Sequence, residues 1–208
     1  PIAYIVGRRE FFGLDFRVTS AVLIPRPDTE LLVELALERL APQGRVLDMG
    51  TGSGAIAVAL AHTRRDAQVT ALDVSPAALD IARQNAVANG ARVRLVQSDW
   101  FSAIEGERFD MVVSNPPYIA AGDVHLSQGD LRFEPAGALT DHADGLSALR
   151  TIAGGAKAHL EPGGWLLMEH GYDQAAQVRS LLAEQGYVDV ASWRDLGGIE
   201  RVSGVRAP

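Results

Sequence analysis

The chain has 208 residues, of which 47% are hydrophobic and none is cysteine, and its formal net charge is -7. That length and apolar content predict one domain with a sizeable core and a small appendage, and the lack of cysteine excludes disulfides, thiolate chemistry and a cysteine-based metal site. The negative charge argues against tight non-specific binding to nucleic acid, and no apolar run is long enough to span a bilayer, so we expect a cytoplasmic protein with no metal and no membrane partner.

The first 28 residues predict a β-hairpin followed by a linker. Two short apolar runs flank Gly13 between residues 10 and 18, which is typical of a hairpin. Pro25 and Pro27 then hold the chain extended, and Asp28 is well placed to cap the helix that follows. We therefore separate residues 1–28 from a main domain at residues 29–208. The chain starts at Pro1 and not at a methionine, which is compatible with a fragment of a longer protein.

From residue 31 the sequence alternates between helical and strand patterns. A leucine stripe at residues 31–40 predicts a first helix, and Ser75 before Pro76 is a typical start of a later one. Short connections predict a doubly wound α/β sheet with right-handed crossovers. The expected strands are residues 45–49, 68–73, 92–97, 109–114 and 165–170, and the expected helices are residues 53–62, 76–89, 146–160 and 174–185. Residues 187–194 and 201–205 predict a closing antiparallel hairpin, which makes the sheet mostly parallel and seven-stranded.

The first strand of this alternation runs into a glycine-rich turn, made of Gly50, Thr51, Gly52, Ser53 and Gly54. Glycines at alternate positions let the backbone turn sharply and approach a ligand closely, with the amides of the next helix facing it. On this segment alone a plain tight turn remains an alternative. The spacing also departs from the Gly-x-Gly-x-x-Gly pattern of pyrophosphate cradles.

Polar and aromatic side chains end the next two strands at the same edge of the sheet. Asp73 can accept both hydroxyls of a ribose, although it could instead cap the following helix, a role that Ser75 partly takes. Trp100 could stack on a purine with Asp99 near the exocyclic amine, although such a pair more often reflects packing and a turn. Together with the glycine-rich turn, these side chains predict a nucleoside site.

Asn115, Pro116, Pro117 and Tyr118 follow the fourth strand at that edge. The two prolines hold Asn115 and Pro116 extended, so the Asn115 side-chain oxygen and the Pro116 carbonyl can converge on one point beside the face of Tyr118. Two acceptors and a flat platform suit a planar NH2 group, and they direct its nitrogen for attack. A nucleoside at the glycine-rich turn would bring its 5′ substituent towards Asn115. S-adenosylmethionine carries an electrophilic methyl group there, so these residues predict methyl transfer to an amide or amine nitrogen.

The motifs resemble those of the bacterial PrmC/HemK family, the protein-(glutamine-N5) methyltransferases that modify the Gln of the Gly-Gly-Gln motif in class I peptide chain release factors. The Asn-Pro-Pro-Tyr tetrad alone is shared with DNA adenine methyltransferases, whereas the stretches at residues 25–30 and 134–139 are much more specific. The resemblance covers nearly the whole chain, through residues 12–13, 16–18, 23–30, 47–57, 114–119, 134–139, 144–146, 169–171 and Gln174.

The resemblance implies the fold of class I S-adenosylmethionine-dependent methyltransferases and a release factor, through its Gly-Gly-Gln loop, as the partner. It places the cofactor contacts at Gly50, Thr51, Gly52, Ser53, Gly54, Asp73, Asp99, Trp100 and Asn115. It assigns the glutamine amide to residues 115–118, with Asn115, Pro116 and Tyr118 as the catalytic group and Pro117 as a further substrate contact. The family also carries a small helical N-terminal domain that this chain lacks, which affects docking more than chemistry. The roles of Arg26, Glu30 and Glu134 stay open.

Three other functions compete with this interpretation. A DNA adenine-N6 methyltransferase would use the same tetrad on a flipped base, but it needs a target-recognition segment and a basic face, and stable nucleic-acid binding is not expected at this charge. A dinucleotide-binding oxidoreductase fits the fold and leaves the tetrad unexplained. A non-enzymatic binding module would tolerate the loss of Asn115.

Overall fold

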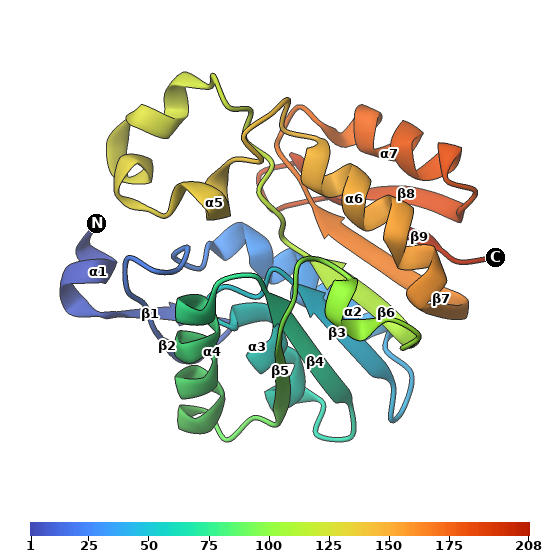
Figure 1. The fold of residues 1–208 in the computed structure, drawn as a ribbon, viewed down its shortest axis with the longest axis horizontal. Coiled ribbons are helices and arrows are strands. Elements are labelled where there is room, and N and C mark those ends of the chain that lie inside the picture. The colour runs from blue at the N-terminus through green and yellow to red at the C-terminus, as the bar shows by residue number, and fades with distance from the viewer.

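The computed structural model describes residues 1–208, and its main sheet has the strand order β5-β4-β3-β6-β7-β9-β8 (Figure 1). Strands β3 to β7 run parallel, whereas β9 is antiparallel to both β7 and β8. This arrangement confirms the mostly parallel, seven-stranded sheet. The strands are β3 (Arg45–Met49), β4 (Gln68–Asp73), β5 (Val93–Gln97), β6 (Phe109–Ser114), β7 (Leu160–Glu169), β8 (Val188–Arg194) and β9 (Glu200–Arg206).

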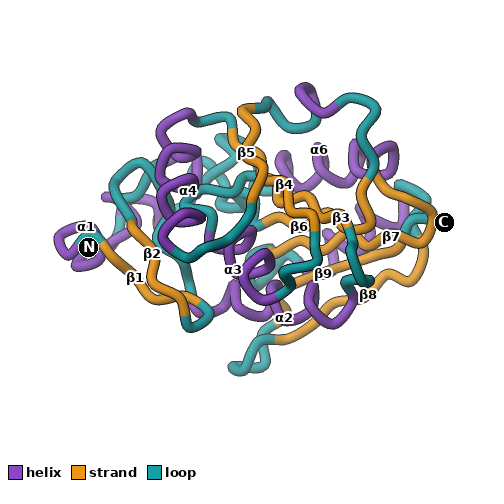
Figure 2. The backbone as a smooth tube through the Cα atoms, turned by 90° about the horizontal axis from the view of Figure 1, so that it is seen from below, coloured by secondary structure: helices purple, strands orange, loops and turns teal.

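Helices cover both faces of the sheet, because successive residues of a strand point to opposite sides. Val46 packs in one core cluster with residues of α2 and α3, and the next residue, Leu47, packs in a second cluster with residues of α6 and α7. Figure 2 shows α6 and α2 on opposite sides of the strands. The helices of the two layers are α2 (Glu30–Arg39), α3 (Ala55–Thr63), α4 (Pro76–Ala88), α6 (Ser147–Ala156) and α7 (Ala175–Glu184). None of the helices combines the length and the hydropathy that crossing a bilayer requires.

The N-terminal segment folds into a short helix, α1 (Ile2–Val6), and a hairpin of β1 (Arg8–Phe11) and β2 (Leu14–Arg17). The hairpin confirms the sequence prediction, whereas α1 was not predicted because five residues carry too little periodicity. Asn85 of α4 fixes the hairpin, since its side chain accepts from the backbone N–H of Arg17 at 2.7 Å and donates to its carbonyl at 3.0 Å. The hairpin therefore packs on the main sheet through α4. A separate domain at residues 1–28 stays a prediction.

Asp28 does not cap α2, and that prediction was wrong. Residues 27–29 form a 3-10 turn, η1 (Pro27–Thr29), so the N-cap position falls on Thr29. The largest error in a strand boundary is at β7, which was predicted to begin at residue 165 but begins at Leu160. Leu160 already pairs with Phe109 of β6, and after a register shift the pairing continues from Trp165 onwards. Gly163 and Gly164 lie at this shift, where glycine accommodates a bulge. The preceding helix accordingly ends at Ala156 and continues as a 3-10 turn, η5 (Lys157–His159).

The long connection between β6 and α6 contains the short helices η3 (Val124–Ser127), η4 (Gly129–Phe133) and α5 (Ala136–Leu139), which the sequence patterns did not predict. Figure 1 shows this connection in yellow, above the carboxyl ends of the central strands. Another short helix, η2 (Ser102–Ile104), joins β5 to β6. The β6–α6 connection therefore lies over the edge of the sheet where the sequence places the nucleoside site.

Candidate active site

A cavity of about 310 Å³ opens at the carboxyl ends of β3, β4 and β6. Crevices in this position are the usual ligand sites of doubly wound sheets, and the volume is within the range of small-molecule pockets. Of the residues predicted for the site, the cavity wall contains Gly50, Thr51, Gly52, Ser53, Asp73, Asp99, Trp100, Asn115 and Pro117. Gly54, Pro116 and Tyr118 are outside the wall.

Asp73 holds the glycine-rich turn against the end of β4. Its Oδ2 accepts from the backbone N–H of Gly52 at 2.9 Å, and its Oδ1 accepts from that of Ser75 at 2.9 Å. The cap of α4 is Ser75, whose hydroxyl accepts from Ala78 N at 3.1 Å. Each carboxylate oxygen of Asp73 still has a lone pair for a ribose hydroxyl.

Gly54 allows α3 and α4 to pack closely against each other. It precedes α3 with a φ of 84°, and a Cβ at this position would be 3.1 Å from the Cβ of Ala82 in α4. The glycine pattern alone could not separate this packing role from a ligand contact. Gly50 and Gly52, with φ of 69° and 55°, have open space where a Cβ would point, and both line the cavity.

Asp48 is a buried carboxyl directly beneath the glycine-rich turn. Its Oδ2 accepts from the Thr51 hydroxyl at 2.8 Å, and its Oδ1 has no hydrogen-bond partner. Burial raises the pKa of Asp48 to about 7, the Thr51 hydroxyl lowers it in part, and the charge of Asp73 raises it further. No role was predicted for Asp48, although an acid inside an apolar strand is a visible signal in the sequence.

Trp100 lines the cavity in a backbone conformation that bulky residues rarely adopt. Its φ is 51°, in the left-handed region, which costs about 1–2 kcal/mol for an L-residue. Ser98 holds the turn in place: its hydroxyl donates to the Trp100 carbonyl at 2.6 Å and accepts from Ala103 N at 3.0 Å. Strain held by surrounding contacts is typical of ligand sites.

Asn115 joins the two halves of the predicted site, since it lines the same cavity as the glycine-rich turn and Trp100. Its Nδ2 donates to the hydroxyl of Thr29 at 3.4 Å, a long hydrogen bond. Ser114, one residue earlier, donates its hydroxyl proton to the carbonyl of Met49 at 2.7 Å, which ties the start of the tetrad to β3.

The side chain of Tyr118 turns away from the cavity. Its hydroxyl donates to Oε2 of Glu169 at 3.3 Å, and burial raises its pKa. Its ring packs against the core cluster that contains α6 and α7. The flat face expected beside the two acceptors is therefore not part of the cavity wall, and a catalytic role for Tyr118 stays a prediction.

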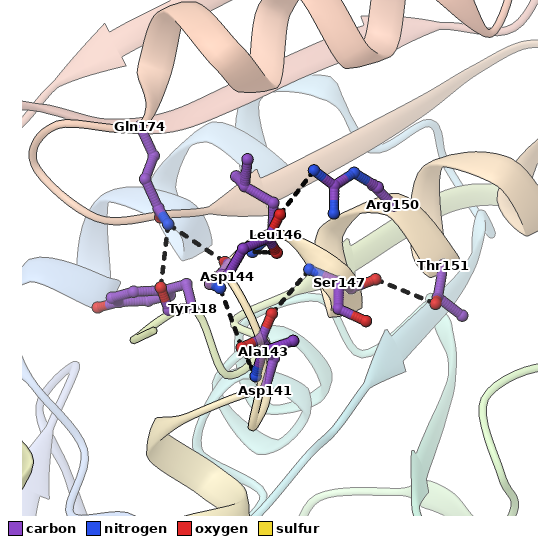
Figure 3. A network of polar contacts seen from close by, with 10 residues as sticks. Tyr118, Asp141, Ala143, Asp144, Leu146, Ser147, Arg150, Thr151 and Gln174 are labelled. Atoms are coloured by element: carbon purple, nitrogen blue, oxygen red, sulfur yellow. Dashed lines mark hydrogen bonds and ion pairs between the residues drawn. The ribbon is translucent and has the colours of Figure 1, made fainter. Parts of the chain in front are cut away.

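The backbone of Tyr118 is held by Gln174, as Figure 3 shows. Gln174 Nε2 donates to the Tyr118 carbonyl at 3.0 Å and to the Gly145 carbonyl at 3.2 Å. Gly145 has a φ of 86°, and a Cβ there would be 2.7 Å from the Tyr118 carbonyl oxygen. Asp141 orders this turn by accepting from the backbone N–H groups of Ala143, Gly145 and Ser147. The end of the tetrad is thereby fixed to the start of α6 and α7.

Arg26, Glu30 and Glu134 form structural contacts around the cavity. Glu134 is buried, forms an ion pair with Arg26 and accepts from Ile24 N at 3.0 Å. Glu30 accepts from Phe12 N at 2.9 Å and so fixes the hairpin turn. These contacts join residues 21–26 to residues 134–138, and both segments line the cavity.

These residues fit S-adenosylmethionine. The glycine-rich turn leaves room for close approach, Asp73 retains acceptor capacity for a ribose, and Trp100 offers an aromatic surface. The carboxylates of Asp73 and Asp99 in the wall also suit a cationic sulfonium group.

Comparison with known proteins agrees with this geometry. Residues 27–139 match the family described as "Methyltransferase small domain". The release factor glutamine methyltransferase of Burkholderia pseudomallei is 58% identical over all of this chain, which covers 76% of that protein. The protein of the same name from Bordetella pertussis is 59% identical over 98% of this chain, and the matched region makes up 77% of that protein.

Solved structures support the fold. The release-factor-specific protein-(glutamine-N5) methyltransferase from Alicyclobacillus acidocaldarius superimposes with a TM-score of 0.55 and 33% identity, covering 92% of this chain and 99% of that one. A methyltransferase from Pyrococcus furiosus has a TM-score of 0.71 over 99% of this chain and 91% of its own, and at 23% identity it shows the shared fold alone.

Proposed function

The chain belongs to the family of release factor glutamine methyltransferases, and we propose that it transfers a methyl group from S-adenosylmethionine to the side-chain amide nitrogen of a glutamine in a release factor. The observation that carries the proposal is the position of Asn115 in the wall of the cavity that contains the glycine-rich turn, Asp73 and Trp100. One cavity thereby holds both the groups that suit a nucleoside and the acceptor that suits an amide.

When bound, S-adenosylmethionine supplies an electrophilic methyl group. Residues 50–53 and Asp73 would hold the nucleoside, and Trp100 would offer its ring to the base. No protein group donates a hydrogen bond to Oδ1 of Asn115, so this oxygen is available to accept from the substrate NH2. The Pro116 carbonyl is the second acceptor that the sequence predicts; Pro116 lies outside the cavity wall, so this contact stays a prediction.

The tetrad accelerates the reaction by alignment. Two acceptors on the amide N–H bonds fix the direction of the nitrogen and increase its electron density. Alignment of this kind can supply on the order of 7–11 kcal/mol of the barrier. The nitrogen proton becomes acidic only as the methyl group transfers, so the step needs no strong base from the protein.

Within this proposal the substrate is the Gln of the Gly-Gly-Gln loop of class I release factors. The relatives' names favour this substrate over the adenine base of DNA, and the charge of -7 also opposes stable binding to a duplex. A protein that modifies release factors works where translation terminates, in the cytoplasm.

The test offers methyl-labelled cofactor to a purified class I release factor and, separately, to duplex DNA. We expect label on the release factor, located to the Gly-Gly-Gln glutamine by mass spectrometry and lost when that glutamine is replaced by alanine. Label that appears only in DNA would overturn the proposal in favour of the adenine-N6 alternative.

A further inference from the structure

Thr29 occupies the N-cap position of α2, but its hydroxyl does not cap the helix. A threonine there usually accepts from a backbone N–H of the first turn, which stabilises the helix start. Thr29 is buried and lines the cavity, and its Oγ1 lies 3.4 Å from Nδ2 of Asn115. The hydroxyl therefore contacts the tetrad and not its own helix.

Glu169 lies next to Asn115 at the carboxyl edge of the sheet. Ser114 of β6 pairs with Met168 of β7, and the two strands are parallel. The residues that come next in each strand, Asn115 and Glu169, therefore lie side by side. Glu169 is 2% exposed; its Oε2 accepts from the Tyr118 hydroxyl, and its Oε1 has no hydrogen-bond partner. A buried carboxyl left partly unpaired costs stability, so packing alone does not explain it.

The hydroxyls of Thr29 and Tyr118 both affect the ionisation of Glu169. Burial raises the pKa of Glu169 to about 7, and the hydroxyls of Thr29 and Tyr118 both lower it in part. The charged groups nearby are Asp28 and Arg201, which act in opposite directions. Thr29 thus contacts Asn115, which follows the strand next to that of Glu169.

We propose that Thr29 and Glu169 are positioning residues that turn the Asn115 side-chain oxygen towards the substrate amide, an inference that rests on the proposed function. Oγ1 of Thr29 accepts from Nδ2 of Asn115, so the hydroxyl presents its lone pairs to Asn115 and its own proton points elsewhere; the ionised form of Glu169, at the end of the neighbouring strand, favours this orientation because a carboxylate only accepts hydrogen bonds. Asn115 then points its NH2 at Thr29 and its oxygen into the cavity. With the amide turned over, its NH2 would meet the NH2 of the glutamine, and two donors cannot pair.

The kinetic test uses the full chain with a release factor and S-adenosylmethionine. Thr29→Val removes the hydroxyl at nearly constant volume, and we expect kcat to fall by roughly tenfold, the worth of one hydrogen bond, while cofactor affinity measured by calorimetry changes much less. Thr29→Ser should restore most of the lost rate. The amide that Glu169→Gln introduces can donate as well as accept hydrogen bonds, so it no longer favours one orientation of the Thr29 hydroxyl. We therefore expect a lower kcat without a matching loss of cofactor affinity. Thr70→Val, a buried substitution of the same kind in β4 outside the cavity wall, is the control for a general packing effect.

A second readout does not depend on the reaction. The side-chain NH2 resonances of Asn115, assigned by comparison with Asn115→Ala in 15N-labelled protein, should shift and exchange faster with water in Thr29→Val and return in Thr29→Ser. If the wild type labels no release factor but these resonances still respond, the proposed function fails and the positioning role stands. An unchanged kcat and unmoved Asn115 resonances in Thr29→Val, in an enzyme that does methylate release factors, would overturn the inference.

Discussion

The backbone N–H of Ile24 donates to Oε2 of Glu134 at 3.0 Å, across 110 positions of sequence. Arg26 pairs with the other oxygen of the same carboxylate and donates to the Ile24 carbonyl at 2.7 Å. These bonds fasten the proline-rich segment before α2 to the segment that contains α5. Residues on both sides line the cavity, so this ion pair sets the shape of one wall.

Removal of Glu134 should loosen that wall. Glu134→Ala leaves Arg26 without its carboxylate partner and the Ile24 N–H without an acceptor, and we expect a loss of about 3 kcal/mol in the free energy of unfolding together with weaker cofactor binding. Glu134→Gln keeps one acceptor and should lose less. Urea unfolding and calorimetry measure both quantities. Asp15→Asn, in the exposed pair with Arg8, is the control and should change neither; an equal effect there would contradict a special role for the buried pair.

Asn115→Ala should abolish methyl transfer while cofactor affinity falls much less. The reason is that Asn115 offers its oxygen to the substrate amide, whereas the nucleoside is held by the glycine-rich turn and Asp73. Single-turnover transfer and equilibrium binding separate the two effects. Asn115→Asp, which is isosteric but has lost the NH2 that meets Thr29, should also be impaired. Undiminished turnover in Asn115→Ala would refute the proposed mechanism.

Asp73→Ala should weaken cofactor binding by roughly one to two orders of magnitude, because hydrogen bonds to a charged group are worth about 1.5–3 kcal/mol. The side chain also holds Gly52 N, so the turn that approaches the nucleoside loses its anchor in the same variant. Calorimetric titration gives the affinity. Asp99→Ala removes an exposed carboxylate from the same wall and serves for comparison. An Asp73→Ala affinity close to that of wild type would exclude the ribose contact.

Gly54→Ala should destabilise the fold more than Gly90→Ala. Both glycines have a positive φ, 84° and 60°, but a Cβ on Gly54 would be 3.1 Å from Ala82 Cβ, whereas nothing lies within 4 Å of one on Gly90. Gly90→Ala therefore costs only the backbone strain, about 1–2 kcal/mol, and Gly54→Ala adds about 1–3 kcal/mol of overpacking between α3 and α4. Chemical denaturation of the two variants gives the difference. Equal losses would show that α4 moves aside freely.

The buried carboxyl of Glu169 should make the protein less stable as the pH rises. Burial raises its pKa from 4.5 to about 7, so between these values the folded state binds a proton that the unfolded chain has released. The free energy of unfolding therefore falls through that interval, by roughly 3 kcal/mol for this group. Asp48, whose pKa burial also raises to about 7, acts in the same direction. Glu169→Gln removes one of the two contributions, so urea unfolding at pH 5 and pH 8 should show a smaller loss in the variant. If the free energy of unfolding falls as much in Glu169→Gln as in wild type, a group other than Glu169 is responsible for the pH dependence.

Local sequence patterns were enough to predict the alternation of strands and helices, the glycine-rich turn after β3, the cap at Ser75 and the position of the tetrad at the end of β6. Each depends on periodicity or on the conformational limits of glycine and proline, which act over a few neighbouring residues. Because parallel strands end at one edge, the local patterns also placed Asp73, Trp100 and Asn115 near a common crevice.

The direction in which each side chain faces, and what it contacts, could be read only from the folded chain. Tyr118 turns to Glu169, 51 positions away, and Asn115 meets Thr29 across 86 positions, pairings that no local pattern encodes. The buried pair of Arg26 and Glu134 likewise depends on how the connection between β6 and α6 folds back over the sheet. Such contacts follow from the packing of the whole chain, because a buried polar group takes whichever partner the fold brings within reach.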